Sequence, residues 1–299
     1  MSESSQARRP PRSILLATDL SARGDRALER AVSLAKHWKA HLTILHVLEE
    51  EMPSLDPDLL PSWKRSAEPV DKVRDHILAD LGELAEAATI LVERGATIDT
   101  IMRVAAISSS ELIVIGVARN ELLGQLMLGR TVDGLLRHSG VPVLVVKERV
   151  RHPYRRIVVA TDFSESSRHA LVTAMHFFAD EAFDILHAYD APMSGLVGDP
   201  ATYRLQYRKL AELDCEAFLR DTAELASRRE RPNVLLEYGA PGHLLREYAV
   251  DHSADLVVVG THGRSAIFDV LLGSVAKQIL EGVPCDTLVV REPRAKPQT

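Results

Sequence analysis

The chain has 299 residues, of which 46% are hydrophobic and 26% are charged, and its formal net charge is −6 at pH 7. This length is about twice that of a typical domain, so two domains are expected. Neither half is basic, which argues against a nucleic-acid partner. No apolar run approaches the roughly 20 residues of a membrane-spanning helix, so no membrane association is expected. Two cysteines give no disulfide framework, and the start lacks a signal-peptide core, so we expect a cytoplasmic protein.

The first half of the chain alternates strand and helix patterns. A disordered tail is expected at residues 1–12, followed by a first domain at 13–148. The apolar run Ile14–Ala17 predicts a strand, and helical spacing predicts an amphipathic helix with Ala27, Ala31, Leu34 and Ala35 on its apolar face. A second strand (Thr43–Val47), a loop rich in acidic residues and proline, and a helix over 71–88 follow. A third strand, a helix, a fourth strand, a helix and a last strand complete the pattern.

The second half repeats the first. RSILLATDLS at 12–21 returns as RIVVATDFS at 156–164. Further on, residues 93–118 align without a gap to 237–262, and the alignment continues to the last strand runs VLVV and TLVV. Solenoid repeats are much shorter, so this repeat indicates duplication of a whole fold. The second half also has a long helix pattern, over 203–229.

Strands that alternate with helices predict parallel sheets covered on both faces. With right-handed crossovers, the expected fold class is α/β, with two tandem doubly wound five-stranded parallel-sheet domains of Rossmann-like type. The polar, basic stretch KERVRHPYR (147–155) marks the boundary, and the second domain covers 155–293. The last strand runs are natural places for the two halves to meet edge to edge.

Ligands of open parallel sheets bind outside the carboxyl ends of the strands, near the switch point. The residues expected at these ends form three pairs, one member from each half: Thr18-Asp19 and Thr161-Asp162, His46-Val47 and His187-Ala188, Gly116 and Gly260. The two histidines are interpreted as core residues. The sequence places no second carboxylate beside Asp19 or Asp162, so a ligand contact is favoured over acid catalysis for Asp162.

The stretch GTHGRSAIFDVLLGS (260–274) has the chemistry of a phosphate cradle. Gly260 and Gly263 allow a bulky anion to approach the backbone, and Gly273-Ser274 lies at the predicted start of a helix. The Ser274 hydroxyl can cap that helix or donate to a phosphate oxygen. Taken alone, the pattern also fits ordinary turn and cap glycines. Neither a Walker motif nor a G-x-G-x-x-G dinucleotide fingerprint is found in the expected position.

With these residues, the sequence resembles a tandem universal stress protein over nearly its whole length. The family pattern is G-x-x-G, nine residues, then G-[ST], and residues 260–274 match it in full. The resemblance implies ATP as ligand, or ADP or AMP, and Mg²⁺ can accompany ATP. It implies that Asp162, within TDFS after Thr161, meets the adenine and ribose side and that the Ala188 backbone meets adenine. The residues implied at the phosphates are Gly260, Gly263, Gly273 and Ser274, flanked by Val259 and Val275; Arg264 is a further candidate.

The first half departs from this pattern. Arg119 stands where the second half has Gly263, and Arg130 stands where it has Ser274, although Gly116 and Gly129 match. We hypothesise that the two arginines fill the phosphate region and leave a degenerate nucleotide site. The alternative is that they recruit an anion, because guanidinium groups suit phosphate geometry.

The expected function is that of a cytoplasmic stress-response protein that binds ATP in its C-terminal half as a regulatory ligand. No catalytic residue and no metal-ligand set is assigned, because no base, arginine finger or metal-holding carboxylate can be placed. The alternatives are a slow ATPase or phosphotransferase, and a nucleotide-free interaction scaffold. A homodimer is a further hypothesis, and the sequence does not identify protein clients.

Overall fold

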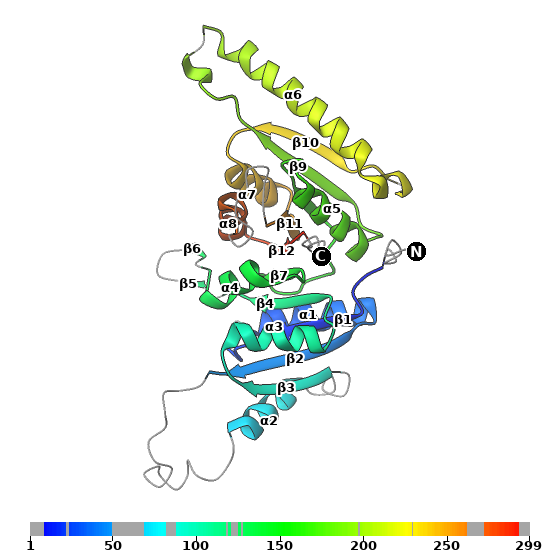
Figure 1. Cartoon of the computed structure of the whole chain (residues 1–299), viewed down its shortest axis with the longest axis vertical. Coiled ribbons are helices and arrows are strands. Elements are labelled where there is room, and N and C mark those ends of the chain that lie inside the picture. The colour runs from blue at the N-terminus through cyan, green and yellow to red at the C-terminus, as the bar shows by residue number, and fades with distance from the viewer. Residues whose placement is uncertain are drawn as a thin grey trace, which may run out of the picture.

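The computed structural model of the chain describes residues 9–21, 24–49, 69–81, 88–117, 119–120, 125–126, 128–196, 198–228, 230–261 and 272–292. Within these ranges, ten strands form one continuous sheet through both halves, and helices cover its two faces (Figure 1). None of the described helices is both long and apolar enough to span a bilayer.

The first half contributes five strands and four helices to this arrangement. In chain order they are β1 (Ser13–Ala17), α1 (Gly24–Trp38), β2 (His41–Leu48), α2 (Pro69–Leu81), β3 (Ala88–Arg94), α3 (Thr97–Ile107), β4 (Leu112–Gly116), α4 (Arg130–His138) and β7 (Val143–Val146). A separate short hairpin, β5 (Arg119–Asn120) with β6 (Gln125–Leu126), lies between β4 and α4.

The second half repeats this order. Its elements are β8 (Ile157–Ala160), α5 (Glu165–Phe177), β9 (Phe183–Tyr189), α6 (Pro200–Asp221), β10 (Asn233–Tyr238), α7 (Pro241–Asp251), β11 (Leu256–Gly260), α8 (Ser274–Gly282) and β12 (Asp286–Val290). Two short 3-10 helices flank α6, at Ser194–Leu196 and Ala223–Ser227.

Both halves are doubly wound. The first strand of each half lies in the middle of its five, parallel to the second strand on one side and to the fourth on the other. Crossover helices then cover both faces, and the point where the strand order reverses lies between the first and fourth strands. The predicted fold class of two tandem five-stranded parallel sheets is confirmed.

The halves meet through their last strands. β7 pairs with β12 antiparallel, with Leu144 opposite Leu288 and Val143 opposite Val289. This pairing satisfies two strands that would otherwise present unpaired N–H and C=O groups at sheet edges. It confirms the expected edge-to-edge contact and makes one sheet of ten strands.

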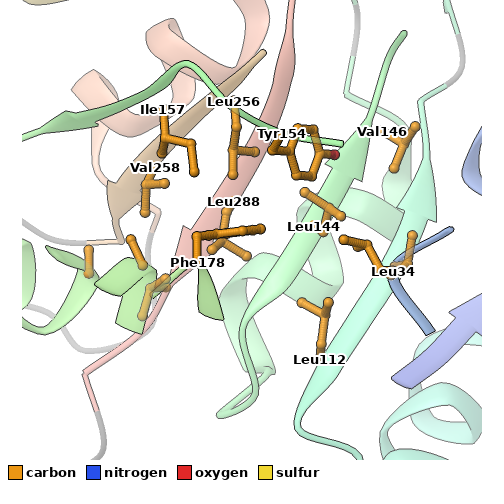
Figure 2. Close-up of a cluster of buried hydrophobic side chains, with 14 of the residues drawn as sticks. Leu34, Leu112, Leu144, Val146, Tyr154, Ile157, Phe178, Leu256, Val258 and Leu288 are labelled. Carbon is orange, nitrogen blue, oxygen red and sulfur yellow. The ribbon is translucent and has the colours of Figure 1, made fainter. Parts of the chain in front are cut away.

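The hydrophobic core continues across this junction. Side chains alternate along each strand, so Ile14 and Leu16 face one side of the sheet while Leu15 and Ala17 face the other. On the first side, Leu144 of β7 and Leu288 of β12 belong to a single cluster (Figure 2). The two domains therefore share a core as well as a sheet.

A buried carboxylate fixes the linker against the second half. Asp286 is fully buried, and its Oδ2 accepts a 2.5 Å hydrogen bond from the Tyr154 hydroxyl and lies 3.3 Å from Arg30 Nε of α1. Its Oδ1 accepts the backbone N–H groups of Lys147 and Glu148. Burial, together with the charge of Asp286, holds the pKa of Tyr154 well above its usual range. The cluster joins both halves and the linker.

Each half also places a cation at the end of the other half's last helix. Lys147, just after β7, donates from Nζ to the carbonyls of Leu280 and Val283 at the end of α8, at 2.7 and 3.0 Å. Arg291, just after β12, donates to the Arg137 carbonyl near the end of α4. Helix carboxyl ends carry partial negative charge, so both contacts are favourable. Burial lowers the pKa of Lys147 to about 8.

Two helix boundaries differ from the sequence-based expectation. α6 spans Pro200–Asp221 instead of 203–229. It begins earlier because the side chain of Asp199 caps it by accepting from the N–H groups of Ala201 and Thr202, with proline in the first position. It ends at Asp221, ahead of the separate 3-10 helix Ala223–Ser227. The helix expected over 71–88 is α2, which begins at Pro69; Ala88 already belongs to β3, and residues 82–87 lie outside the described ranges.

Candidate functional site

The turn after β8 is held by Thr161. This residue is buried, its Oγ1 accepts the N–H of Phe163 at 2.9 Å, and its hydroxyl lies 2.9 Å from that of Ser167. Its carbonyl accepts a 2.8 Å hydrogen bond from His187 Nδ1, and the His187 ring stacks on Phe163. Thr161 and His187 thus shape the turn from inside, and His187 takes the structural part expected of it.

Asp162 follows at the mouth of this turn, where it is half-buried. Its Oδ1 accepts both the N–H and the hydroxyl of Ser164, at 3.1 and 2.6 Å, and Ser164 in turn caps α5 by accepting the N–H of Ser167. The carboxylate is therefore oriented by its neighbours before any ligand arrives. Sequence reasoning missed Ser164, although the Asp-x-Ser spacing occurs in both halves.

Ala188 lies on the strand beside this turn. Ala160 of β8 pairs with Leu186 of β9, so Ala188 is two residues beyond the last paired position, toward the carboxyl edge. It is half-buried, and its own partner on the other side is Glu237 of β10. Its place is consistent with a backbone contact at the edge where Asp162 lies.

Gly260 ends β11 in a crowded position. A Cβ built there would lie 2.7 Å from Ser166 Oγ and 3.0 Å from the Ser166 carbonyl carbon at the start of α5. Glycine is required at this point for close packing of the strand end against the helix. The side chain of the preceding Val259 is buried in the core, so only its backbone is left for a ligand.

Gly273 caps α8 without a side chain. Its N–H donates to the Thr261 carbonyl at 2.9 Å, which ties the start of the helix to the residue after Gly260. No side chain caps the helix, and both Ser274 and Val275 in its first turn are exposed. Ser274 is the first helical residue and not the cap. The first-turn amides of α8 are the groups that a helix offers to an anion.

The remaining two residues of the expected cradle, Gly263 and Arg264, fall in the stretch 262–271, which lies outside the described residues. The structure thus brings Asp162, Ala188 and Gly260 to one edge of the second half, next to the start of α8.

A cavity of about 410 Å³ lies at the equivalent edge of the first half. Its lining includes the counterparts of the expected site residues, namely Asp19, Val47, Gly116, Gly129 and Thr131. Glu49 and Thr97 form another part of its wall and are joined by a 2.8 Å hydrogen bond. Arg130 is exposed at the start of α4 and does not line this cavity, while the side chain of Arg119 lies outside the description. The cavity is a feature that the sequence did not predict.

Among the residues that the structure describes, no three His, Cys, Asp or Glu side chains are grouped so that they could hold a metal ion. The two cysteines, Cys215 and Cys285, are both free and buried. Burial raises the pKa of the Cys285 thiol to about 12, so this side chain is not activated as a nucleophile.

Known proteins resemble the chain over nearly its full length or over about half of it. A universal stress protein of Mycolicibacterium smegmatis is 28% identical and covers 93% of this chain and 96% of its own. The crystal structure of a universal stress protein from Archaeoglobus fulgidus covers 94% of this chain and 98% of its own with a TM-score of 0.67, at 19% identity. A universal stress protein solved in complex with cAMP is 29% identical over 46% of this chain and 96% of its own, but its TM-score of 0.34 is too low for its ligand to be carried over.

The family model described as the universal stress protein family matches the chain twice, at residues 11–147 and 153–291. The two matches coincide with the two halves of the sheet. The chain therefore belongs to the universal stress protein family, as a tandem member with two such domains.

Proposed function

We propose that this protein is a cytoplasmic stress-response protein that binds ATP in its C-terminal half as a regulatory ligand. The observation that carries the proposal is the start of α8, where Gly273 provides a helix N-terminus without a side-chain cap and Ser274 is exposed. The Gly273–Thr261 hydrogen bond holds this start beside the end of β11. A helix N-terminus at the carboxyl edge of a parallel sheet suits a phosphate chain.

The contacts proposed for the ribose and the adenine follow from where Asp162 and Ala188 lie. Phosphates at the first turn of α8 leave the ribose and adenine to extend along the carboxyl edge toward β8 and β9. Asp162, oriented by Ser164, is an acceptor for ribose hydroxyls, and the backbone at Ala188 is a partner for adenine. The hydroxyl of Ser274 would donate to a phosphate oxygen.

The nucleotide acts in this proposal as a ligand and not as a committed substrate. Phosphoryl transfer needs a positioned nucleophile, a metal held by carboxylates and a cation at the transferred group. We assign none of these roles to a described residue. Binding alone stabilises the state that binds, so ATP would shift the C-terminal half toward one conformation.

The proposal is tested by identifying the small molecules that the purified full chain carries. Mass spectrometry of the released ligand is expected to find adenine nucleotide in the wild-type protein and to lose it in Gly263→Arg, which imposes the upstream residue on the downstream loop. The matched control is Arg119→Gly, the reverse change in the first half, which is expected to leave the nucleotide content unchanged. Undiminished ATP in Gly263→Arg would refute the assignment of the site.

A further inference from the structure

A second pocket, of about 310 Å³, lies far from the proposed nucleotide site, at the junction of the two halves. We call it the linker pocket. Its wall on one side is the linker (148–156), and on the other the end of α7 with the loop that leads to β11 (249–255). Cys285 and Ala249 give it an apolar floor, and Arg30 of α1 reaches it from the first half. It is at the amino end of β11, about 16 Å of strand away from Gly260 at ~3.3 Å per residue.

The linker pocket is basic in a protein of net charge −6. Four arginines line it, Arg30, Arg149, Arg151 and Arg156, against the carboxylates of Glu148 and Asp255; His152 also contributes to the lining. Clefts lined by one sign of charge concentrate ligands of the opposite sign. The four arginines against two carboxylates favour an anion in this pocket.

Most of the charged groups in the wall are already engaged within the protein. Asp255 accepts the N–H groups of both Arg155 and Arg156 at 3.0 Å, and its other oxygen lies 3.7 Å from His152 Nε2. Arg156 donates to the carbonyl of His252 at 3.0 Å. The guanidinium of Arg30 is buried beside Asp286. These contacts hold the wall in shape and neutralise Asp255 and Arg30 in part.

Arg149 and Arg151 differ from the charged residues of the wall that are held by contacts within the protein. Both are exposed, and neither forms a hydrogen bond or an ion pair with another residue in the described part of the chain. They lie on one linker whose ends are anchored, because Glu148 binds Asp286 through its N–H and Tyr154 binds it through its hydroxyl. The two guanidinium groups are thus available to a ligand without the loss of an existing contact.

We propose that the linker pocket binds a small phosphorylated anion, held by Arg149 and Arg151. Guanidinium groups offer paired N–H donors that match phosphate oxygens, and a pocket of this volume suits a ligand the size of a sugar phosphate or a short inorganic phosphate. Glu148 disfavours the ligand, and Arg156 in the same lining offsets that repulsion. The ligand would bridge the linker and the second half, and so stiffen the junction between the domains. This inference does not depend on ATP binding.

The experiment is isothermal titration calorimetry of the full chain at fixed ionic strength, with inorganic pyrophosphate in one arm and glucose 6-phosphate in the other. Wild-type protein is expected to bind at least one of the two probes, and the arm that binds tells an inorganic phosphate from a phosphate ester. The double variant Arg149→Ala/Arg151→Ala is expected to raise the Kd for that probe at least tenfold.

The control Arg208→Ala/Arg220→Ala removes the same charge from exposed positions on α6, and is expected to keep the Kd within twofold of the wild type. Thermal unfolding of both variants checks that they are folded. Three results would overturn the proposal: no binding of either probe to the wild type, an unchanged Kd in the linker variant, or an equal loss in the control. ATP titrated into the linker variant separates the two sites, since its affinity for ATP should stay that of the wild type.

Discussion

The two halves of the molecule build their first turn in the same way and begin their last helix after an uncapped glycine, but with different first residues. In the first half, Asp19 accepts from the N–H and hydroxyl of Ser21 at 3.0 and 2.6 Å, and His46 Nδ1 donates to the Thr18 carbonyl at 2.9 Å. The second half repeats these contacts with Asp162 and its neighbours within 0.1 Å. Because the half with arginine in place of Ser274 retains this turn, the Thr-Asp-x-Ser geometry belongs to the fold and does not by itself indicate a working nucleotide site.

The difference lies at the glycines and at the first residue of the last helix. Gly129 has open space where its Cβ would be, whereas a Cβ at Gly273 would lie 3.2 Å from the Thr261 carbonyl oxygen. Arg130 begins α4, and Ser274 begins α8. Nucleotide binding should therefore be sought in the residues that differ between the copies, since the shared residues are explained by packing.

The largest expected effect concerns a residue that only one half has. Asp286 has proline at the equivalent place, Pro142, so the buried cluster with Arg30 and Tyr154 has no counterpart. Asp286→Ala leaves a buried guanidinium without its carboxylate, and is expected to lower the free energy of unfolding by about 3–5 kcal/mol. Urea denaturation measures it, with the exposed Asp251→Ala as control. If Asp286→Ala lowers the free energy of unfolding no more than Asp251→Ala does, the cluster does not hold the halves together.

The next largest expected effect is that of a substitution at Gly260, which tests whether glycine is needed there for packing. Gly260→Ala brings a methyl group against the Ser166 backbone, which cannot move aside easily, and is expected to cost about 1–3 kcal/mol in the free energy of unfolding. Gly129→Ala, in open space, is expected to stay within about 0.5 kcal/mol of the wild type. Thermal or urea unfolding of the two variants makes the comparison. Equal stabilities would mean that the close approach at Gly260 is not a constraint.

The smallest effect concerns Lys147, one of the two cations that each half places at the end of the other half's last helix. The pKa of Lys147 is lowered from 10.5 to about 8, so above pH 8 the unfolded chain binds more protons at this residue than the folded one. Its contribution to stability therefore rises with pH between about 8 and 10.5. Relative to Lys147→Met, the wild type is expected to gain roughly 1 kcal/mol from pH 8 to pH 9.

The pH range from 8 to 9 is chosen because a second titrating group, Cys285, changes the stability above pH 9. The pKa of the Cys285 thiol is raised from 9.0 to about 12, so its contribution falls as the pH rises above 9. Urea denaturation of both proteins at pH 8, 8.5 and 9 gives the difference directly. A difference that does not change with pH would contradict the lowered pKa of Lys147.

The sequence alone predicted the fold well because its signals are local and occur twice. Short apolar runs such as Ile14–Ala17 and Ile157–Ala160 predict buried strands, and the repeat confirms each of them independently. The contact between the last strands was also predicted. Helix ends were less accurate, since the start of α6 depends on the cap formed by Asp199, which periodicity does not reveal.

The candidate site was predictable only in part. Asp162, Gly260 and Gly273 follow strands or begin a helix, so topology brings them to one edge. The tight contact between Gly260 and Ser166 joins residues far apart in the chain, and the cluster around Asp286 joins three separate segments. No sequence periodicity marks such contacts. The cavity in the first half has no sequence signal, because its volume depends on side-chain packing; Arg130, one of the two arginines hypothesised to fill the phosphate region, does not line it.

We propose one ATP site per chain, in the second half. The sharpest test is calorimetric titration of ATP into nucleotide-free full-length protein, with the reciprocal variants Ser274→Arg and Arg130→Ser. We expect a stoichiometry of one ATP per chain for the wild type and for Arg130→Ser, and at least a tenfold weaker Kd for Ser274→Arg. Two ATP per chain in the wild type, or an affinity that Ser274→Arg leaves unchanged, would contradict it.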